Sequence, residues 1–263
     1  AILENQGART ALVTTRGFRD VLEFRRLRFP DLFSLDYTPP KPLVQRRHRF
    51  EVIERIMPDG SVRQPLDDVS VESVLEKLEQ LQPEAIAICL LHSYANPIHE
   101  RKVVEAVNNR FPNLYVSGSI DVLPEIREYE RTSTTVINSY IGPIVDNYLE
   151  SMQKRLDHAN MAVPISIMQS NGGVMSYAAA RRSPARIIES GPAAGVVEAI
   201  RLADRIGLKD VITFDMGGTT AKASLIEQGK PSLTTEYEVG AGIQLSNRLV
   251  KGRGHALKLP VID

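Results

Sequence analysis

The sequence predicts an α/β protein in which strands alternate with helices, and three observations lead to that class. Short apolar runs of strand length occur at 10–15 (TALVTT), 84–91 (EAIAICLL) and 114–119 (LYVSGS). Amphipathic segments at 70–82 and 97–111 separate these runs. A chain of 263 residues, with 43% hydrophobic and 24% charged side chains, can bury one sizeable core or two smaller ones. The alternation favours a parallel or mixed sheet flanked by helices.

The remaining elements of the first half follow from local patterns. Residues 16–50 are basic, irregular and punctuated by prolines, so we expect a packed loop that leads to a strand near 46–56. The sequence PDG at 58–60 predicts a turn between two extended segments. In 70–82 the apolar residues recur at helical spacing. These residues are Val71, Val74, Leu75, Leu78 and Leu81.

A long helix is predicted from about Thr132 to Asp157, because apolar side chains recur there every four residues. Pro143 should kink or break this helix, and we expect a domain crossing within 125–145. The charged residues of 125–133 permit two interpretations. They form either a solvated helical face with ion pairs or a network that lines a cleft.

The second half contains further strands and one clear helix. We predict a strand in 163–173 that ends in a glycine loop, and a strand in 184–191. A helix should follow over 192–207, with Gly207 as its C-cap. The run VITFD at 211–215 predicts a buried strand.

Composition excludes several classes of function. The formal net charge is zero, so no overall field favours nucleic acid or an anionic membrane. The single cysteine, Cys89, fits a reducing compartment, and its apolar neighbours predict a core residue rather than a nucleophile. No apolar run approaches the ~20 residues of a membrane span, so we expect a cytoplasmic protein. His92 and His99 lack the spacing of metal ligands, which argues against a metal site there.

The stretch ITFDMGGTTAKASLI at 212–226 combines strand, loop and strand. Glycines let another group approach the backbone closely, and the threonines add hydroxyl donors, so the loop can hold a phosphate. Asp215, at the strand end, is placed to organise a cation beside that phosphate. The alternative is a glycine-rich β-hairpin with a surface aspartate.

Three loops of this type occur within about fifty residues, at 169–173 (QSNGG), 190–195 (SGPAAG) and 215–220 (DMGGTT). Each follows a predicted strand, and the second opens a helix. Because such loops gather at the carboxyl edge of a parallel sheet, we expect the three to converge there. The free N–H groups at the helix start would favour an anion.

These motifs together resemble one family. The segments ARTALVTTRGFRDVLEFRR, LPEIREYERTSTTVINSYIGPIV, IMQSNGG, SGPAAG and FDMGGTTAK are similar to those of the hydantoinase A/5-oxoprolinase family, within the actin–hexokinase–heat-shock chaperone superfamily. The resemblance covers essentially the whole chain. It implies an RNase-H-like, actin-like ATPase architecture of two domains, with mixed sheets flanked by helices and with ATP and Mg²⁺ as cofactors. The implied domains are 1–132, from the N-terminal hydantoinase/oxoprolinase domain, and 133–263, the first part of the second domain.

The resemblance also implies site residues. Asp215 is the expected catalytic and metal-binding residue. The expected nucleotide-binding residues are Gly217, Gly218, Thr219, Thr220, Ser190, Gly191, Ala194, Asn171 and Gly172. The first phosphate loop of the family precedes this chain. The roles of Glu189 and Lys222 stay open, since Glu189 stands earlier than the acid of chaperone relatives and Lys222 either reaches a phosphate or lies on the surface.

The implied activity is ATP-dependent hydrolysis of a cyclic amide through phosphorylation of the substrate. Two alternatives remain: the large subunit of an ATP-dependent ketone carboxylase, and a nucleotide switch of the sugar-kinase or chaperone kind. The chain opens without methionine and closes in an apolar run, so we expect a piece of a longer polypeptide, truncated at both ends and inactive alone. The expected partners are a cyclic amide, a B-type subunit or domain and further copies in an oligomer, and exposed apolar surface is expected as well.

Overall fold

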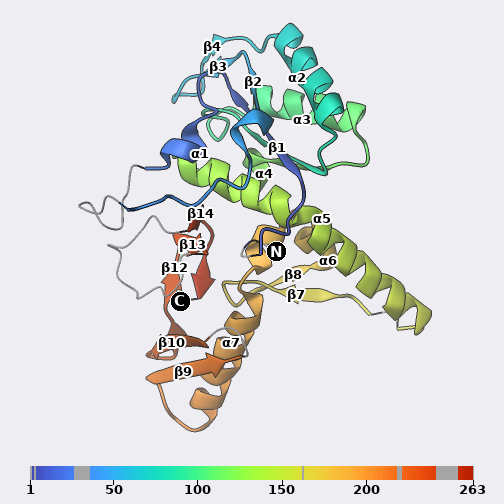
Figure 1. Ribbon diagram of the computed structural model, residues 1–263. Coiled ribbons are helices and arrows are strands. Elements are labelled where there is room, and N and C mark those ends of the chain that lie inside the picture. Colours follow the sequence, from blue (N-terminus) through green and yellow to red (C-terminus); the bar gives the residue numbers. More distant parts are fainter. Residues whose placement is uncertain are drawn as a thin grey trace. The chain divides into compact units, whose positions relative to one another are not determined.

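The computed structural model describes residues 2, 4–26, 36–161, 163–217, 221–240 and 254–262 (Figure 1). The chain divides into two compact units. The first unit comprises Ala1–Asn147 and Glu238–Lys258, and the second comprises Tyr148–Tyr237 and Leu259–Asp263. The predicted domains, 1–132 and 133–263, are a separate assignment and stay a prediction.

A parallel sheet forms the centre of the first unit. Its strands are ordered β2-β1-β5-β6, and every neighbouring pair is parallel. Thr15 at the end of β1 lies opposite Val52 at the end of β2. The sequence predicted all of these strands, and the parallel arrangement is confirmed. Their bounds are Thr10–Thr15 for β1, Arg49–Val52 for β2, Ala85–Cys89 for β5 and Tyr115–Gly118 for β6.

Helices cover both faces of this sheet (Figure 1). Side chains that alternate along a strand point to opposite faces, so Ile86 and Ile88 pack with α2 and α3, whereas Ala87 and Cys89 pack with Val136 of α5. Every residue of β5 is therefore buried. The helices of the first unit are α1 (Val21–Phe24), α2 (Asp68–Leu81), α3 (Ile98–Arg110), α4 (Ser119–Val122) and most of α5 (Glu128–His158).

Short elements complete the first unit. The predicted turn at 58–60 joins the antiparallel strands β3 and β4, and a short 3-10 helix precedes β2. Strands β13 and β14 form a further pair, although Tyr237, the first residue of β13, belongs to the second unit. The bounds are Arg55–Ile56 for β3, Val62–Gln64 for β4, Arg46–His48 for the 3-10 helix, Tyr237–Val239 for β13 and His255–Leu257 for β14.

Helix α5 continues through Pro143, so the possibility that the proline breaks the helix is wrong (Figure 1). A proline inside a helix costs about 3 kcal/mol, and tertiary packing outweighs that cost here. Residues 130–142 are all buried. Gly142 packs so closely against the ring of Tyr115 that a Cβ atom would lie 2.3 Å from Tyr115 Cε1.

The second unit contains short antiparallel pairs and one long helix. The segment 184–191 is not a strand, contrary to prediction, because Pro184 starts a 3-10 helix and α7 begins at Ser190. Gly207 adopts φ +77° after α7, as the C-cap prediction requires. The elements are β7 (Ser166–Met168), β8 (Val174–Ser176), α6 (Tyr177–Arg182), the 3-10 helix Pro184–Ile187, α7 (Ser190–Arg205), β9 (Val211–Met216), β10 (Ala221–Glu227), β11 (Lys230–Pro231), β12 (Leu233–Thr234) and β15 (Val261–Ile262).

One face of β9 is open, so its predicted burial is wrong for alternate residues. Ile212, Phe214 and Met216 are 73%, 68% and 71% exposed. The intervening residues point to the face on which α7 packs. These side chains form the kind of exposed apolar surface that the sequence analysis expects. Within the described ranges, no helix has both the length and the apolar character that crossing a membrane requires.

Candidate functional site

Asp215 lies in β9, near its end, and its side chain is exposed. β9 pairs with β10 in an antiparallel hairpin, and Lys222 stands directly opposite Asp215. Residues directly opposite in such a pair lie on the same face, so the side chains of Asp215 and Lys222 share one face of the hairpin. This is the face of the hairpin that also carries Thr213, not the exposed apolar face.

Lys222 connects the hairpin to the start of α7. Its Nζ forms an ion pair with Oε2 of Glu189, the residue that immediately precedes the helix. The hydroxyl group of Tyr237 donates a hydrogen bond of 2.7 Å to the other carboxylate oxygen of Glu189. Both oxygens of Glu189 are therefore engaged, and the carboxylate fixes the position of the lysine.

The loop at 169–173 joins the same cluster through Ser170. The backbone N–H of Glu189 donates to Ser170 Oγ at 3.1 Å, and the N–H of Ser170 donates to the carbonyl of Arg186 at 2.8 Å. Ser170 is only 1% exposed, so these contacts are shielded from water. The loop at 169–173, through Ser170, and the β9–β10 hairpin, through Lys222, thus both contact Glu189, which immediately precedes α7.

The reason for this convergence differs from the predicted one. The expectation was the carboxyl edge of a parallel sheet. In the structure, β7 with β8 and β9 with β10 are antiparallel hairpins. The hairpins are held to α7 by Ser170 and Lys222. Side-chain contacts, rather than parallel strands, hold these two hairpins at the start of α7.

The predicted site residues differ in how open they are. Asn171 and Gly172 hold their own loop: Asn171 Oδ1 accepts from the N–H of Gly173 at 2.9 Å, and a Cβ on Gly172 would lie 2.9 Å from Ile262. By contrast, Gly191 is exposed, with no atom within 4 Å of the position of a Cβ. Of the other predicted residues, Ser190 and Ala194 are half-buried, Gly217 is exposed, and Gly218, Thr219 and Thr220 lie outside the described residues.

This arrangement can attract both an anion and a cation. The first N–H groups of a helix have no partner inside it, and the positive end of the helix dipole lies there, so the open backbone at Gly191 favours a phosphate. Lys222 adds positive charge beside it. The described residues contain no group of three or more histidine, cysteine or acidic ligands that could hold a metal ion. A single carboxylate such as Asp215 suits Mg²⁺, which keeps water and phosphate oxygens as its other ligands.

Comparison with protein families identifies the chain. A model described as hydantoinase/oxoprolinase matches residues 131–263, and one described as the hydantoinase/oxoprolinase N-terminal region matches residues 1–111. The chain belongs to the hydantoinase/oxoprolinase family. The resemblance seen in the sequence motifs is thereby confirmed.

Several characterised and uncharacterised family members are similar along nearly the whole chain. An uncharacterized protein of Methanocaldococcus jannaschii is 44% identical over 96% of this chain and 37% of its own length. The alpha subunit of caprolactamase from Pseudomonas jessenii is 32% identical over 97% of this chain and 38% of its own length. 5-oxoprolinase 1 of Arabidopsis thaliana is 30% identical over 98% of this chain and 22% of its own length. The chain thus spans little more than a third of the length of the first two relatives.

Two solved structures of family members share the fold. The nucleotide-free structure of acetone carboxylase aligns over 100% of this chain and 36% of its own, with a TM-score of 0.83 and 27% identity. The ATP-dependent caprolactamase from Pseudomonas jessenii aligns over the same shares, with a TM-score of 0.82 and 30% identity. The mixed α/β fold, with its parallel sheet flanked by helices, is therefore that of the family.

The charged residues at the start of α5 are not a solvated face, at least at Glu130 and Arg131. These side chains are 5% and 2% exposed. Arg131 donates from Nη2 to the carbonyl of Leu90 at 2.6 Å, and Glu130 forms an ion pair with Arg26. The first of the two interpretations is wrong for these residues, because tertiary packing buries residues 130–142 of the helix.

The histidines and the cysteine serve the interior of the first unit. His92 Nδ1 lies 2.8 Å from the carbonyl oxygen of Ile56, and His99 Nδ1 lies 2.8 Å from Oε2 of Glu54. Cys89 is buried in the core, as predicted, and burial raises the pKa of its thiol. A buried thiol of this kind is a poor nucleophile.

Sequence reasoning missed two members of the cluster in the second unit, Ser170 and Tyr237. It named Glu189 and Lys222 without a role. The sequence did contain a signal for the pairing of Lys222 with Asp215, because a hairpin with a four-residue connection places these two residues opposite each other. The pairing of Lys222 with Glu189, which lies 33 residues earlier, had no local signal.

Proposed function

We propose that this chain is the nucleotide-binding part of the A-type subunit of an ATP-dependent enzyme that hydrolyses cyclic amides. The observation that carries the proposal is the cluster at the start of α7. There, Lys222 and the carboxylate of Asp215 share one face of a hairpin, beside an open helix N-terminus. Similarity to caprolactamase and 5-oxoprolinase supports the substrate class.

We assign each residue of the cluster a role in binding ATP and Mg²⁺. Asp215 holds Mg²⁺, which neutralises phosphate charge when it is bound. Lys222, oriented by Glu189, contributes a positive charge toward the phosphates. The residues proposed to contact the nucleotide are Gly217, Gly218, Thr219, Thr220, Ser190, Gly191, Ala194, Asn171 and Gly172. The proposal includes a two-domain architecture of the actin-like ATPase kind, which similarity to two ATP-dependent family members supports.

The proposed reaction activates the cyclic amide by phosphorylation of its oxygen. The amide oxygen attacks the terminal phosphorus of ATP, an O–P bond forms, and the P–O bond to ADP breaks. Water adds to the activated carbon as the ring C–N bond breaks, and a second water releases phosphate from the resulting acyl phosphate. Positive charge near the transferred group stabilises this reaction, because negative charge on the phosphoryl oxygens must be held in place.

A second candidate is ATP-dependent carboxylation of a ketone. The structural match to acetone carboxylase and the 29% identity to the acetone carboxylase beta subunit of Xanthobacter autotrophicus favour it. Both reactions begin with a carbonyl oxygen that attacks ATP, so the cluster serves either. A nucleotide switch would instead show no turnover that depends on a small substrate.

The test uses the longer polypeptide that contains this chain, together with its B-type subunit. Phosphate release from ATP is measured with caprolactam, hydantoin, 5-oxoproline, or acetone plus bicarbonate. We expect one cyclic amide to stimulate release, and we expect Asp215→Ala to lower kcat/KM about 100- to 1000-fold.

Asp204→Ala is the matched control, because Asp204 is an exposed aspartate further along α7. It should leave turnover unchanged. Stimulation by acetone plus bicarbonate alone would select the carboxylase. Normal turnover and magnesium dependence in Asp215→Ala would show that the cluster is not the nucleotide site.

A further inference from the structure

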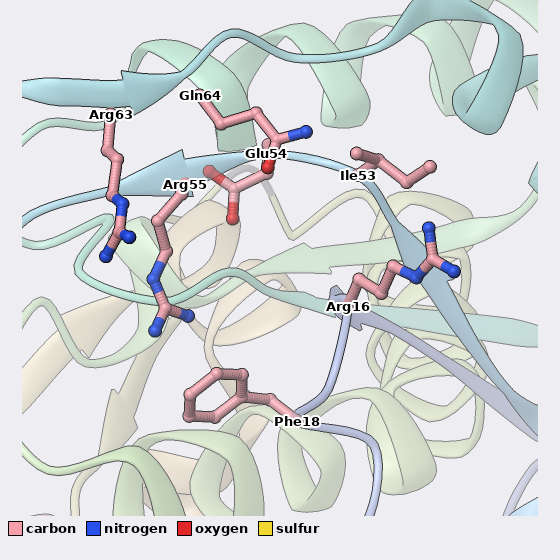
Figure 2. Close-up of a pocket in the computed structure, with 7 residues that line it drawn as sticks. All are labelled: Arg16, Phe18, Ile53, Glu54, Arg55, Arg63 and Gln64. Atoms are coloured by element: carbon pink, nitrogen blue, oxygen red, sulfur yellow. The ribbon is translucent and has the colours of Figure 1, made fainter.

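A second polar site lies in the first unit and is built from other residues than the cluster at the start of α7. It is a cavity of about 520 Å³ (Figure 2). The side chains of seven residues line it: Arg16, Phe18, Ile53, Glu54, Arg55, Arg63 and Gln64. A volume of this size suits a small molecule.

The fold places this cavity at the carboxyl edge of the parallel sheet. Residues 16–18 directly follow β1, and residues 53–55 directly follow β2. The N–H of Arg16 donates to the carbonyl of Val52 at 2.9 Å, so the two chain segments leave the sheet together. Ligands of open α/β sheets bind at this edge, because the loops that follow parallel strands gather there.

Gly17 allows the first of these segments to turn. Its φ of +89° is one that other residues rarely adopt, and its N–H donates to Glu51 Oε1 at 2.6 Å. The turn therefore presents Arg16 and Phe18 to the cavity on either side of the glycine (Figure 2).

Three guanidinium groups line the cavity, those of Arg16, Arg55 and Arg63. Figure 2 shows the side chains of Arg55 and Arg63 on one side of Glu54 and that of Arg16 on the other. Within the described part of the chain, none of the three arginines forms an ion pair with a carboxylate. Arg55 instead lies over the ring of Phe18, with Cζ 4.9 Å from the ring centroid, which holds its planar group in place.

Glu54 carries the one carboxylate among the seven described residues that line the cavity, and this carboxylate is already engaged. Glu54 is 3% exposed, its Oε1 accepts from the hydroxyl of Thr15, and its Oε2 lies 2.8 Å from Nδ1 of His99. The net charge of the side chains that line the cavity is therefore positive. Arginine matches the planar, two-oxygen geometry of carboxylates and phosphates.

We propose that this cavity binds the carboxylate or phosphate group of a small molecule through Arg16, Arg55 and Arg63, with Phe18 fixing the orientation of Arg55. The proposal stands independently of the reaction proposed above. Its residues belong to the first unit, whereas Asp215 belongs to the second.

Titration calorimetry on the 263-residue chain tests this site. The probes are 5-oxoproline, inorganic phosphate and 2-pyrrolidinone, which has the ring of 5-oxoproline without its carboxylate. At least one of the two anions should bind, and 2-pyrrolidinone should not. Binding of 5-oxoproline alone identifies a carboxylate ligand, and binding of phosphate alone identifies a phosphate ligand.

Variants then locate the bound anion. Arg16→Met, Arg55→Met and Arg63→Met should each weaken binding about tenfold, the loss expected for a hydrogen bond to a charged group. Arg101→Met, a change at an exposed arginine of α3, is the matched control and should leave Kd unchanged. Circular dichroism checks that each variant is folded.

Three results would overturn the proposal: no binding of either anion at tens of millimolar, equal binding of 2-pyrrolidinone, or unchanged affinity in all three arginine variants. Asp215→Ala should not alter Kd for these anions. That variant therefore separates failure of this site from failure of the proposed nucleotide site.

Discussion

The strands β5 and β9 show how similar apolar segments acquire different environments. Both are rich in isoleucine or other large side chains, and the sequence predicts a buried strand for each. In β5 every residue is buried, because α2 and α3 cover one face of the sheet and α5 covers the other. In β9 only the face toward α7 is covered, and Ile212, Phe214 and Met216 are exposed.

The same difference governs the charged groups. In the first unit, Glu54 and His99 form a pair whose side chains are 0% and 7% exposed. In the second, the side chains of Glu189 and Lys222 are 18% and 32% exposed. A buried pair tolerates little change, whereas a half-open pair near solvent can exchange one partner for a ligand. We therefore expect the Glu54–His99 pair in the first unit to keep its partners, and the Glu189–Lys222 pair at the start of α7 to be able to exchange one.

The largest expected effect comes from breaking the buried pair. His99→Leu leaves Glu54 in the interior with Thr15 as its remaining side-chain partner, so we expect a loss of about 3–5 kcal/mol in the free energy of unfolding. Lys222→Met breaks the partly exposed pair and should cost about 1 kcal/mol or less. Urea unfolding followed by circular dichroism measures both. Equal losses would refute the contrast between the two units.

A matched pair of apolar truncations tests the strands themselves. Ile86→Ala removes a side chain that is 0% exposed and should cost about 2–5 kcal/mol. Ile212→Ala removes the same atoms from a side chain that is 73% exposed and should cost about 1 kcal/mol or less. Both values come from urea unfolding. If Ile212→Ala lowered the free energy of unfolding by more than Ile86→Ala does, the exposed face of β9 would be covered in solution.

The smallest expected effect is a pH dependence from Glu100, which is fully buried in α3. Burial raises the pKa of its carboxyl group above 4.5, although the N–H groups of Leu90 and Ile120 oppose the shift. Between 4.5 and the folded-state pKa the folded protein binds more protons than the unfolded chain, so stability falls as pH rises through this window.

Glu100→Gln should remove that fall from a plot of unfolding free energy against pH. It also loses an acceptor, which changes the absolute stability, so the slope is the informative quantity. Glu105→Gln, at an exposed position of the same helix, should keep the wild-type slope. An unchanged slope in Glu100→Gln would show that this carboxyl group does not titrate within the window.

Periodicity predicted most elements correctly, and the failures have physical causes. The strand expected in 184–191 is a 3-10 helix followed by α7, since Pro184 and the contacts of Ser170 with Glu189 outweigh a weak local preference for extended backbone. The pattern of α5 was recognised, but its continuation through Pro143 depends on the packing of Gly142 against Tyr115. At the candidate site, glycine spacing selected the segments, and their role in binding stays a prediction, while the contacts of Glu189 with Ser170 and Lys222 were beyond local reasoning.

The sequence by itself determined the alternation of strands and helices, the position of Asp215 at the end of a strand, and the motifs that mark the family. These depend on residues that are close in the chain. The tertiary structure alone decided that both faces of β5 are covered but only one face of β9. It also decided that Lys222 pairs with Glu189 and that Arg16, Arg55 and Arg63 line one cavity. Burial and ion pairing depend on which distant segments pack together, and a local pattern of residues does not contain that information.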